Sequence, residues 1–361
     1  MADITVSAVT MMGQKHRGRG VPCEDASIAV QKNGVSCVVV CDGAGSKQYT
    51  HARFGSKCAC ETISALLTDH FDSLYNENRE AAVRALIIAA IHVEFAKLME
   101  QHGLDNIERL SCTLLFCAVK DRRVMVGHIG DGLIAGVSST AVYPITMPQN
   151  GTNASSTYFV TAPHAADYLR FIKTTTDNLH GIALMTDGVQ DSVYDENSGL
   201  VRPVVARMID TAAAGRQKSE AEINSILEKY IVGASNNSDD ASFGILLFEG
   251  TQGPTGKLPD KAAAFPKSEE TFKDLQNAMV PAVKRARKMI LGAAATGGGS
   301  DKSNEEKQPV KKGEREEAAE ETKVKIKTGA PDKGTVFLVL IAAIELIMII
   351  LLIVKLIIDK G

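Results

Sequence analysis

The sequence lacks a strong excess of charge of either sign. Its 40 Lys and Arg residues stand against 43 Asp and Glu residues, which gives a formal net charge of −3 at pH 7. Proteins that bind nucleic acid usually carry a strongly basic surface, because they neutralise phosphates. The charge balance therefore gives no reason to expect nucleic acid as a partner.

Cysteine is absent from the last two thirds of the chain. All seven Cys residues lie between Cys23 and Cys117, without the regular spacing of a small secreted disulfide framework, and no apolar signal segment follows Met1. This pattern predicts reduced thiols in a cytosolic domain. Cys58 and Cys60 have the spacing of one arm of a metal site, but no second pair matches them. We therefore interpret both as thiols that pack along a helix.

One long apolar run is present, from Val336 to Val354, and only Glu345 interrupts it. As a helix this run is roughly 28 Å long, enough to cross the hydrocarbon core of a bilayer. The upstream flank carries Lys323, Lys325, Lys327 and Lys333. We expect residues 334–358 to be a single-pass C-terminal anchor that leaves the upstream chain on the cytoplasmic side. A charge at mid-membrane depth is costly, so Glu345 is either tolerated or paired in an oligomer.

Between this run and the globular part, the composition changes twice. Residues 293–333 have almost no large apolar side chains, so we predict a flexible charged linker. Residues 251–292 are expected to form a helical extension, bent at Pro281. The basic stretch at 284–288 is either a solvated helix face or a contact with lipid headgroups. Residues 1–250 are predicted to form the catalytic domain.

The pattern of residues 1–250 is mixed. Strand-like runs occur at Ser27–Gln31, Val35–Cys41, Ser111–Val119, Arg123–Ile129, Leu133–Val137, Tyr158–Thr161, Gly181–Met185 and Ser242–Phe248. Helical stretches follow Thr50, run from Arg79 to Gln101, and fill much of 203–231. A hairpin-sized connection, KDRR, joins the third and fourth strands. Hairpins beside long helices predict an α+β fold with antiparallel sheets rather than a doubly wound parallel sheet.

Carboxylates stand at the ends of several of these strands. They occur at Asp42-Gly43, Asp131-Gly132, Asp187-Gly188 and Asp239-Asp240. Asp-Gly is a strong hairpin signal, and a hairpin fits Asp131 well because a strand resumes at once. No returning strand follows Asp42 or Asp187, so those two aspartates end a strand without opening a hairpin.

Carboxylates gathered at neighbouring strand ends repel one another, which raises their pKa values. A divalent cation removes that penalty. Oxygen ligands with few nearby His or Cys residues favour Mg²⁺ or Mn²⁺ over Zn²⁺. Two such ions sharing a carboxylate acidify a water, which can attack phosphorus. Spacing alone leaves a metal cluster and scattered turn aspartates equally open.

Five motifs taken together narrow this choice. In order, they are PCEDASIAV, VVVCDGAGS, VGHIGDG, IALMTDGVQDSV and SDDASFGILLF. This series resembles that of the metal-dependent type 2C serine/threonine protein phosphatases, most closely their compact bacterial members, over residues 10–249. The resemblance implies a four-layer α-β-β-α sandwich, in which two antiparallel sheets pack face to face with helices outside both. With the C-terminal transmembrane helix added, this is the fold that we expect.

The resemblance also implies a set of ligands for two Mn²⁺ or Mg²⁺ ions. Asp42 matches the aspartate that bridges both ions, and Gly43 matches the residue whose backbone carbonyl is a ligand. Asp187 and Asp239 match the remaining ligands of the first ion, and Glu24 matches the acidic ligand of the second. Among these, Asp42 and Asp187 are the residues that we assign to catalysis.

Four further aspartates acquire roles from the same motifs. Asp25 matches a position in the second layer around the metals. Asp131 and Asp191 match positions that contribute to a weaker third metal site in some members. Asp240 is expected to be a neighbour of the ligand Asp239, because the family usually has Asn at that position.

The chain departs from the family pattern at two places. Many members have His where this chain has Ala44, and that His is thought to protonate the leaving group. A metal-bound water, His16 or His51 would then have to deliver the proton. Eukaryotic members also hold the phosphate with an Arg at the position of Gly20. Here the candidate phosphate-binding residues flank it, and they are Arg17 and Arg19.

The sequence therefore predicts a membrane-tethered cytosolic enzyme that hydrolyses phosphoserine and phosphothreonine on proteins, by attack of a water that bridges two metal ions. The expected partners are phosphorylated proteins, the lipid bilayer and, from the family, an opposing serine/threonine kinase. Two alternatives stay open. One is a binding module that has kept the fold but lost turnover, which Ala44 and the missing Arg suggest. The other is a hydrolase of small phosphate esters.

Overall fold

The computed structural model describes residues 4–149, 157–236, 238–248 and 270–296. The chain divides into two units, Met1–Asp301 and Lys302–Gly361, and the second lies outside the described residues. Within the described ranges, none of the helices combines the length and the apolar character needed to cross a membrane. The predicted anchor at 334–358 lies outside these ranges, as does most of the predicted linker.

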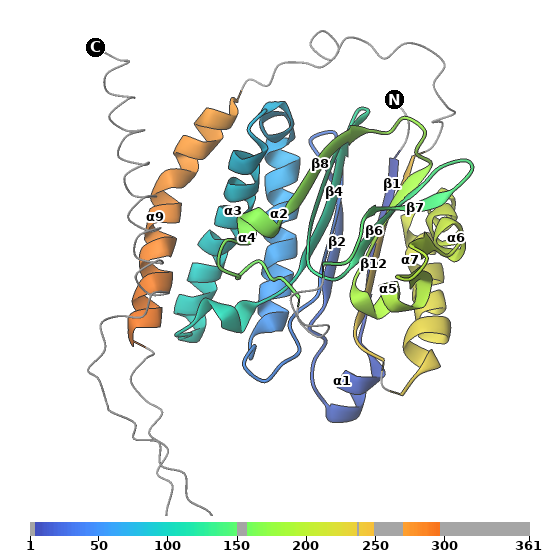
Figure 1. Ribbon diagram of the computed structural model, residues 1–361, viewed down its shortest axis with the longest axis horizontal. Helices are drawn as coiled ribbons and strands as arrows, with labels where there is room; N and C mark the ends of the chain where they lie inside the picture. Colours follow the sequence, from blue (N-terminus) through green and yellow to red (C-terminus); the bar gives the residue numbers. More distant parts are fainter. Residues whose placement is uncertain (1–3, 150–156, 237, 249–269, 297–361) are drawn as a thin grey trace, which may run out of the picture. The chain divides into compact units, whose positions relative to one another are not determined.

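Two antiparallel five-stranded sheets pack face to face (Figure 1). The first has the order β1 (Ile4–Met11), β12 (Ala241–Phe248), β9 (Gly181–Met185), β6 (Leu133–Val137) and β7 (Val142–Thr146). The second has the order β2 (Ala26–Lys32), β3 (Val35–Cys41), β4 (Leu114–Lys120), β5 (Arg123–Ile129) and β8 (Arg170–Thr175). A two-stranded ribbon pairs β10 (Tyr194–Asp195) with β11 (Leu200–Val201). The predicted α+β fold with two antiparallel sheets is confirmed.

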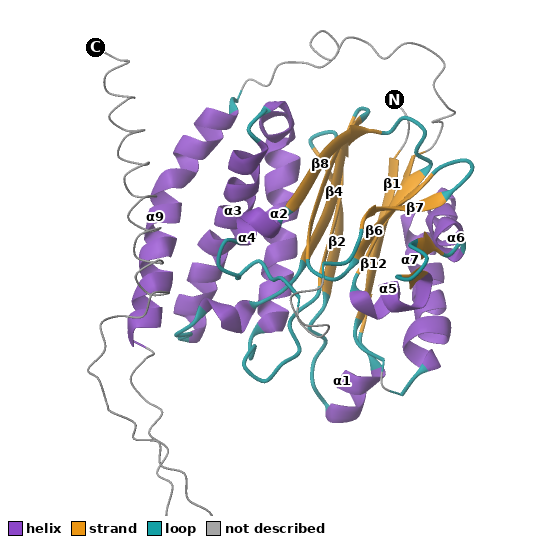
Figure 2. Cartoon of the chain, viewed as in Figure 1, coloured by secondary structure: helices purple, strands orange, loops and turns teal. Residues whose placement is uncertain are grey.

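Helices cover the outer faces of both sheets (Figure 2). The second sheet is covered by α2 (Ala52–Asn76), with α3 (Glu80–His102) packed on α2 and α9 (Phe272–Thr296) packed on α3. The first sheet is covered by α6 (Val204–Asp210) and α7 (Arg216–Ile226). Shorter helices are α1 (Gln14–Arg19), α4 (Ala165–Tyr168) and α5 (Asp187–Val193). The helical turns are η1 (Ile107–Leu110), η2 (Thr211–Ala214), η3 (Leu227–Ile231) and η4 (Val232–Ala234).

Strand β3 shows why an uninterrupted apolar run forms the centre of the sandwich. Successive side chains of a strand point to opposite faces. Cys37 and Val39 belong to the apolar core beneath α2 and α3, whereas Val38 and Val40 belong to the core between the two sheets. Because both faces are buried, every position is apolar or small and the usual alternation disappears.

Most predicted strands agree with the structure to within a few residues, and one prediction is wrong. Residues 158–161 do not form a strand: a turn begins at Val160, where the Ala162 N–H donates to the Phe159 carbonyl ahead of Pro163. Among the strands of the described residues, β1, β7, β8 and the two-residue strands β10 and β11 were not predicted. Strand β7 contains Pro144, which weakens a strand signal, but β7 is an edge strand and tolerates it.

The two predicted connections have different outcomes. KDRR is a hairpin, as predicted: Lys120 pairs with Arg123 across β4 and β5, and only two residues lie between them. The hairpin interpretation of Asp131-Gly132 is wrong. Strand β5 belongs to the second sheet and β6 to the first, so this connection carries the chain from one sheet to the other. Gly130, with φ of +123°, makes the change of direction.

Candidate metal centre

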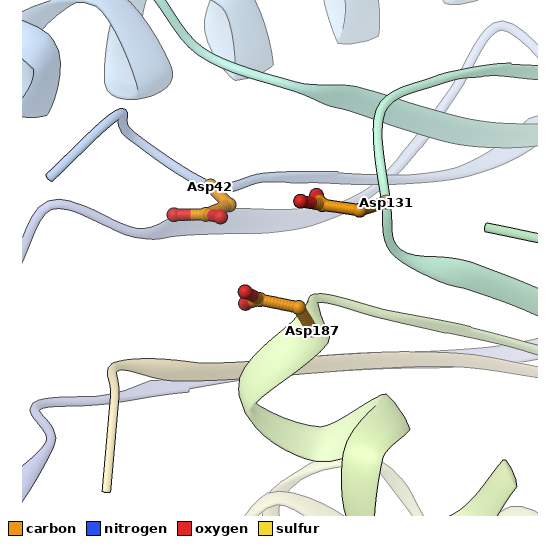
Figure 3. A group of neighbouring side chains, drawn as sticks. All are labelled: Asp42, Asp131 and Asp187. Atoms are coloured by element: carbon orange, nitrogen blue, oxygen red, sulfur yellow. The ribbon is translucent and has the colours of Figure 1, made fainter. Parts of the chain in front are cut away.

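Three aspartates from both sheets meet at one end of the sandwich (Figure 3). Asp42 follows β3 and Asp131 follows β5, both in the second sheet, whereas Asp187 follows β9 of the first sheet and opens α5. One carboxylate oxygen from each residue lies within 4.8 Å of the others. The structure therefore gathers three of the predicted site residues, including Asp131, which local sequence had assigned to a hairpin.

The glycines after Asp42 and Asp187 allow close packing of backbones. A Cβ atom on Gly43 would lie 2.4 Å from the Glu24 carbonyl oxygen, and one on Gly188 would lie 2.0 Å from the Asp240 carbonyl oxygen. Both contacts are too short for any side chain. Glycine is therefore required after Asp42 and after Asp187 because another chain segment packs against it, and not because of a hairpin turn. Each of these segments carries another predicted site residue.

Electrostatics distinguish this cluster from ordinary surface carboxylates. Burial, reinforced by the Asp187 charge, raises the pKa of Asp42 well above its usual range. Burial, reinforced by the Asp131 charge, does the same for the pKa of Asp187. Burial also raises the pKa of Asp131. These carboxylates resist ionisation unless a positive charge lies between them.

The donor set fits a hard divalent cation. The Oδ1 atom of Asp131 is buried and has no hydrogen-bond partner among the described residues, although buried polar atoms usually have one. All three ligand atoms of the cluster are carboxylate oxygens, which suit Mg²⁺ and Mn²⁺. A cation at this point would satisfy the oxygen and remove the mutual repulsion.

Asp25, which the resemblance places in the second layer around the metals, lies outside the three-aspartate cluster. It is buried, and its Oδ2 atom accepts a hydrogen bond of 2.9 Å from the Thr186 hydroxyl. Burial raises the pKa of Asp25 to about 7. Asp42 is held by Thr113, whose hydroxyl accepts from the Asp42 N–H at 2.9 Å and whose own N–H donates to the Asp42 carbonyl at 2.8 Å.

The two aspartates before β12 lie in very different surroundings. The Asp239 side chain is 45% exposed and pairs with Lys15 at 2.8 Å. It lies outside the three-aspartate cluster, but its charge contributes to the raised pKa of Asp187. Asp240 is buried and accepts hydrogen bonds from the Gly13 N–H at 2.8 Å and from the Glu24 N–H at 2.6 Å.

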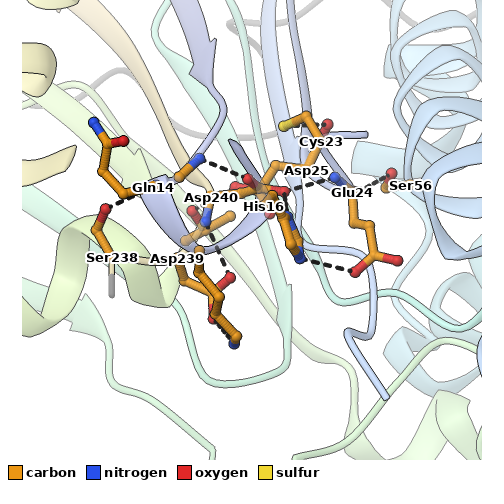
Figure 4. Close-up of polar contacts among 12 residues, drawn as sticks. Gln14, His16, Cys23, Glu24, Asp25, Ser56, Ser238, Asp239 and Asp240 are labelled. Atoms are coloured by element: carbon orange, nitrogen blue, oxygen red, sulfur yellow. Dashed lines mark hydrogen bonds and ion pairs between the residues drawn. The ribbon is translucent and has the colours of Figure 1, made fainter. Parts of the chain in front are cut away.

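Glu24 lies in the loop between α1 and β2, and its carboxylate is not part of the cluster. Burial raises the pKa of Glu24. Its Oε2 atom lies 3.7 Å from Nε2 of His16, whose Nδ1 atom lies 2.7 Å from Oδ2 of Asp240 (Figure 4). Neither Lys15 nor His16 was predicted to contact these acidic residues. Each lies 224 residues from its aspartate in the sequence, so no local pattern shows the contact.

The remaining predicted residues lie at the edge of the site or away from it. Asp191 is exposed on α5, one turn after Asp187, and outside the cluster. Arg17 makes a two-pronged pair with Glu228, with both N···O distances 3.0 Å. Arg19 is exposed, and no ion pair is recorded for it within the described part of the chain.

The positions considered for protonation of the leaving group lie in different surroundings. Ala44 is buried, and its N–H donates to the Ser111 carbonyl at 3.0 Å, so this position offers no proton donor from a side chain. His51 bonds the Thr50 hydroxyl through Nδ1 at 2.9 Å and lies beside the His102 ring. His16 is buried, contrary to the solvated loop residue that a lone His usually is.

Comparison with known proteins agrees with this geometry. The family model for protein phosphatase 2C matches residues 12–228, more than half of the chain, and the chain belongs to this family. It is therefore a protein serine/threonine phosphatase of the metal-dependent kind, and the cofactor of such enzymes is Mn²⁺ or Mg²⁺.

Several solved structures resemble this chain at low sequence identity. A bacterial serine phosphatase is 16% identical, with a TM-score of 0.50 over 69% of this chain and 100% of that one. The phosphatase Stp1 from Staphylococcus aureus is 16% identical, with a TM-score of 0.46 over 69% and 96%. PppA from Pseudomonas aeruginosa is 14% identical, with a TM-score of 0.48 over 68% and 99%. A search of curated proteins finds no match.

Proposed function

We propose that this chain removes phosphate from phosphoserine and phosphothreonine side chains of proteins, at the centre formed by Asp42, Asp131 and Asp187. The observation that carries the proposal is the meeting of three strand-end carboxylates within 4.8 Å, with a buried Asp131 oxygen that lacks a partner in the described structure. Such a centre suits hydrolysis of a phosphate ester, which depends on positioning and charge neutralisation.

We assign two ions to this centre. Asp42 would be shared, with Asp187 and Asp239 on one side and Glu24 with the Gly43 carbonyl on the other. When bound, Mn²⁺ or Mg²⁺ supplies a nucleophilic water at neutral pH and neutralises charge on the phosphoryl oxygens. A third, weaker site would use Asp131 and Asp191.

The protein groups around the centre divide the remaining tasks. Asp25, bonded to Thr186, supports Asp42 from the interior. Because Arg17 is engaged by Glu228, we assign binding of the substrate phosphate to Arg19. Lys15, already at the rim beside Asp239, places a second cation near the incoming phosphate.

The proposal is tested by Mn²⁺-dependent release of phosphate from a phosphothreonine peptide by the full chain. We expect turnover in the parent protein, and loss of turnover in Asp42→Asn and Asp187→Asn. Metal binding without any turnover in the parent would contradict the proposed activity and favour the alternative of a binding module. Ala44 and the pairing of Arg17 with Glu228 are the observations that favour this alternative. A strong preference for small phosphate esters over the peptide would indicate the other alternative.

We also propose that residues 334–358 anchor the chain in a bilayer, through a linker at 293–333 and the helical extension at 251–292. The apolar run at 336–354 supports this. Such an anchor would place the catalytic domain, residues 1–250, on the cytoplasmic side, near membrane-bound phosphoproteins and an opposing kinase.

The test of the anchor is deletion of residues 334–361. The deleted protein should move from the membrane fraction to the soluble fraction with its peptide turnover unchanged. If it still sediments with membranes, the anchor assignment fails, and the basic residues of α9 around Lys284 become the candidates for attachment.

A further inference from the structure

His16 occupies a buried position between two carboxylates that belong to different parts of the chain (Figure 4). It lies on α1 and is 6% exposed. Its Nδ1 atom is 2.7 Å from Oδ2 of Asp240, and because a carboxylate can only accept, the imidazole Nδ1–H donates this hydrogen bond. Its Nε2 atom lies 3.7 Å from Oε2 of Glu24, beyond hydrogen-bond distance, and this contact is an ion pair when both ring nitrogens carry a proton.

Asp240 holds the His16 imidazole in a fixed orientation. Its side chain is 3% exposed, and besides His16 it accepts hydrogen bonds from the backbone N–H groups of Gly13 and Glu24. Three donors hold one carboxylate, so Asp240 cannot turn without breaking several buried hydrogen bonds. The orientation of the His16 ring is set by that carboxylate.

Glu24 depends on these contacts for its position. It lies in a loop, with no helix or strand to hold it. Its backbone N–H is held by Asp240 and its carbonyl accepts from the Ser56 hydroxyl at 2.5 Å. The carboxylate, at the end of a flexible side chain, lies 3.7 Å from Nε2 of His16. Asp240 therefore fixes the backbone of Glu24 directly and its side chain through His16.

We propose that His16 is a positioning residue for the metal centre, which holds the Glu24 carboxylate ready for the second ion. This inference rests on the proposed function, in which Glu24 is a ligand. Residues that orient a ligand typically contribute about 10- to 100-fold to metal affinity. The imidazole should affect the binding of only one ion. Within the described structure, the cluster of Asp42, Asp131 and Asp187 makes no contact with His16 that would hold it together.

Two isosteric substitutions separate this role from a purely structural one. Asn places its amide nitrogen near the position of Nδ1, so His16→Asn keeps the bond to Asp240 and loses the contact with Glu24. Gln places its amide nitrogen near the position of Nε2, so His16→Gln keeps a donor beside Glu24. If His16 only braced the fold through Asp240, Asn would be the better replacement.

The matched control is His180, which also forms a His–Asp pair. Its Nε2 atom lies 2.8 Å from Oδ1 of Asp210, and it precedes β9 at the end of that strand opposite to Asp187. His180→Asn removes a His–Asp pair far from the proposed ligands, and His180→Gln keeps a donor near Asp210. Both variants should therefore leave Mn²⁺ binding unchanged.

The experiment is calorimetric titration of Mn²⁺ into the full chain, in detergent, with each variant checked by thermal unfolding. We expect His16→Asn to weaken one of two ions by about 10-fold and His16→Gln to weaken it by less than about 3-fold. The other ion should be unaffected in both. In the double variant His16→Asn with Glu24→Gln, binding should be no weaker than in Glu24→Gln alone.

Three results would overturn the inference. The first is unchanged binding in His16→Asn while Glu24→Gln loses an ion, which leaves the proposed function standing. The second is that Asn preserves affinity better than Gln, which assigns His16 to the fold. The third is unchanged binding in Glu24→Gln itself, which removes Glu24 from the ligands and His16 from its role together.

Discussion

Asp131 and Asp240 are both largely buried aspartates that flank strands near the same end of the sandwich, but they have opposite surroundings. Asp240 accepts three hydrogen bonds, from Gly13, His16 and Glu24. Asp131 has a buried oxygen without a partner in the described structure, next to two further carboxylates. Burial and residue type alone therefore do not distinguish a metal ligand from a structural anchor. What distinguishes them is whether the protein itself satisfies the charge.

The largest expected effect comes from the cluster that Asp131 forms with Asp42 and Asp187. Asp42→Asn should lower Mn²⁺-dependent turnover of a phosphothreonine peptide by about 1000-fold, equivalent to about 4 kcal/mol. Because burial and neighbouring charges raise the pKa of Asp42, the same change should raise the melting temperature of the metal-free protein. A loss of both turnover and metal-free stability would place Asp42 with the structural carboxylates.

Asp240 should show the reverse behaviour. Asp240→Ala removes the acceptor of three buried hydrogen bonds, so we expect a loss of about 3 kcal/mol in the free energy of unfolding. Urea unfolding of the metal-free protein measures this loss. If Asp240→Ala instead unfolds with the midpoint of the parent, the contrast between the two aspartates is wrong.

The pH dependence of stability sharpens the comparison for Asp25. Burial raises the pKa of Asp25 from its usual acidic value to about 7 in the folded protein, so the folded state binds this proton more tightly than the unfolded state. The Asp25 contribution to metal-free stability therefore grows as pH falls below 7, by about 2 kcal/mol by pH 5.5.

The measurement is urea unfolding of the parent and of Asp25→Asn at both pH values. The comparison cancels groups distant from Asp25, and it reports Asp25 together with Asp42 and Asp187, because the Asp25 charge contributes to the raised pKa values of both. Asp25→Asn should lack this gain. A parallel pH dependence of both proteins would show that Asp25 titrates alike in the folded and unfolded states.

The smallest effect is expected at the rim. Asp239→Ala breaks an ion pair with Lys15 in which the two side chains are 45% and 33% exposed, so the metal-free free energy of unfolding should change by less than about 0.5 kcal/mol. Mn²⁺ affinity should nevertheless fall by about 10-fold, because the proposed ligand is gone. Calorimetry beside urea unfolding checks both values, and unchanged Mn²⁺ affinity would remove Asp239 from the ligands.

The residue pattern predicted the antiparallel sheets and the strand-end aspartates for a physical reason, whereas the sandwich was implied by the family resemblance. Strand β3 is buried on both faces, so its apolar run is visible without alternation, and an aspartate directly after such a run stands out. The prediction of a hairpin at Asp131 was wrong because the sequences of two successive strands do not indicate which sheet each strand will join.

The contacts of His16 and Lys15 could not be predicted from the local sequence, for a different reason. Both lie on α1, while their aspartates precede β12 at the other end of the domain sequence. Only the pairing of β1 with β12, in which Met11 faces Ala241, brings the two segments together. Strand β1 was itself among the strands not predicted, so its consequences could not be anticipated.

The most direct test is a crystal structure of the protein with bound Mn²⁺, in which manganese is located by its anomalous scattering. The account predicts manganese within coordination distance of the Asp42 and Asp187 carboxylates, a second ion on the Glu24 side, and none in contact with Asp240. Manganese bound at Asp240, or a cluster of Asp42, Asp131 and Asp187 that stays empty in excess Mn²⁺, would contradict it.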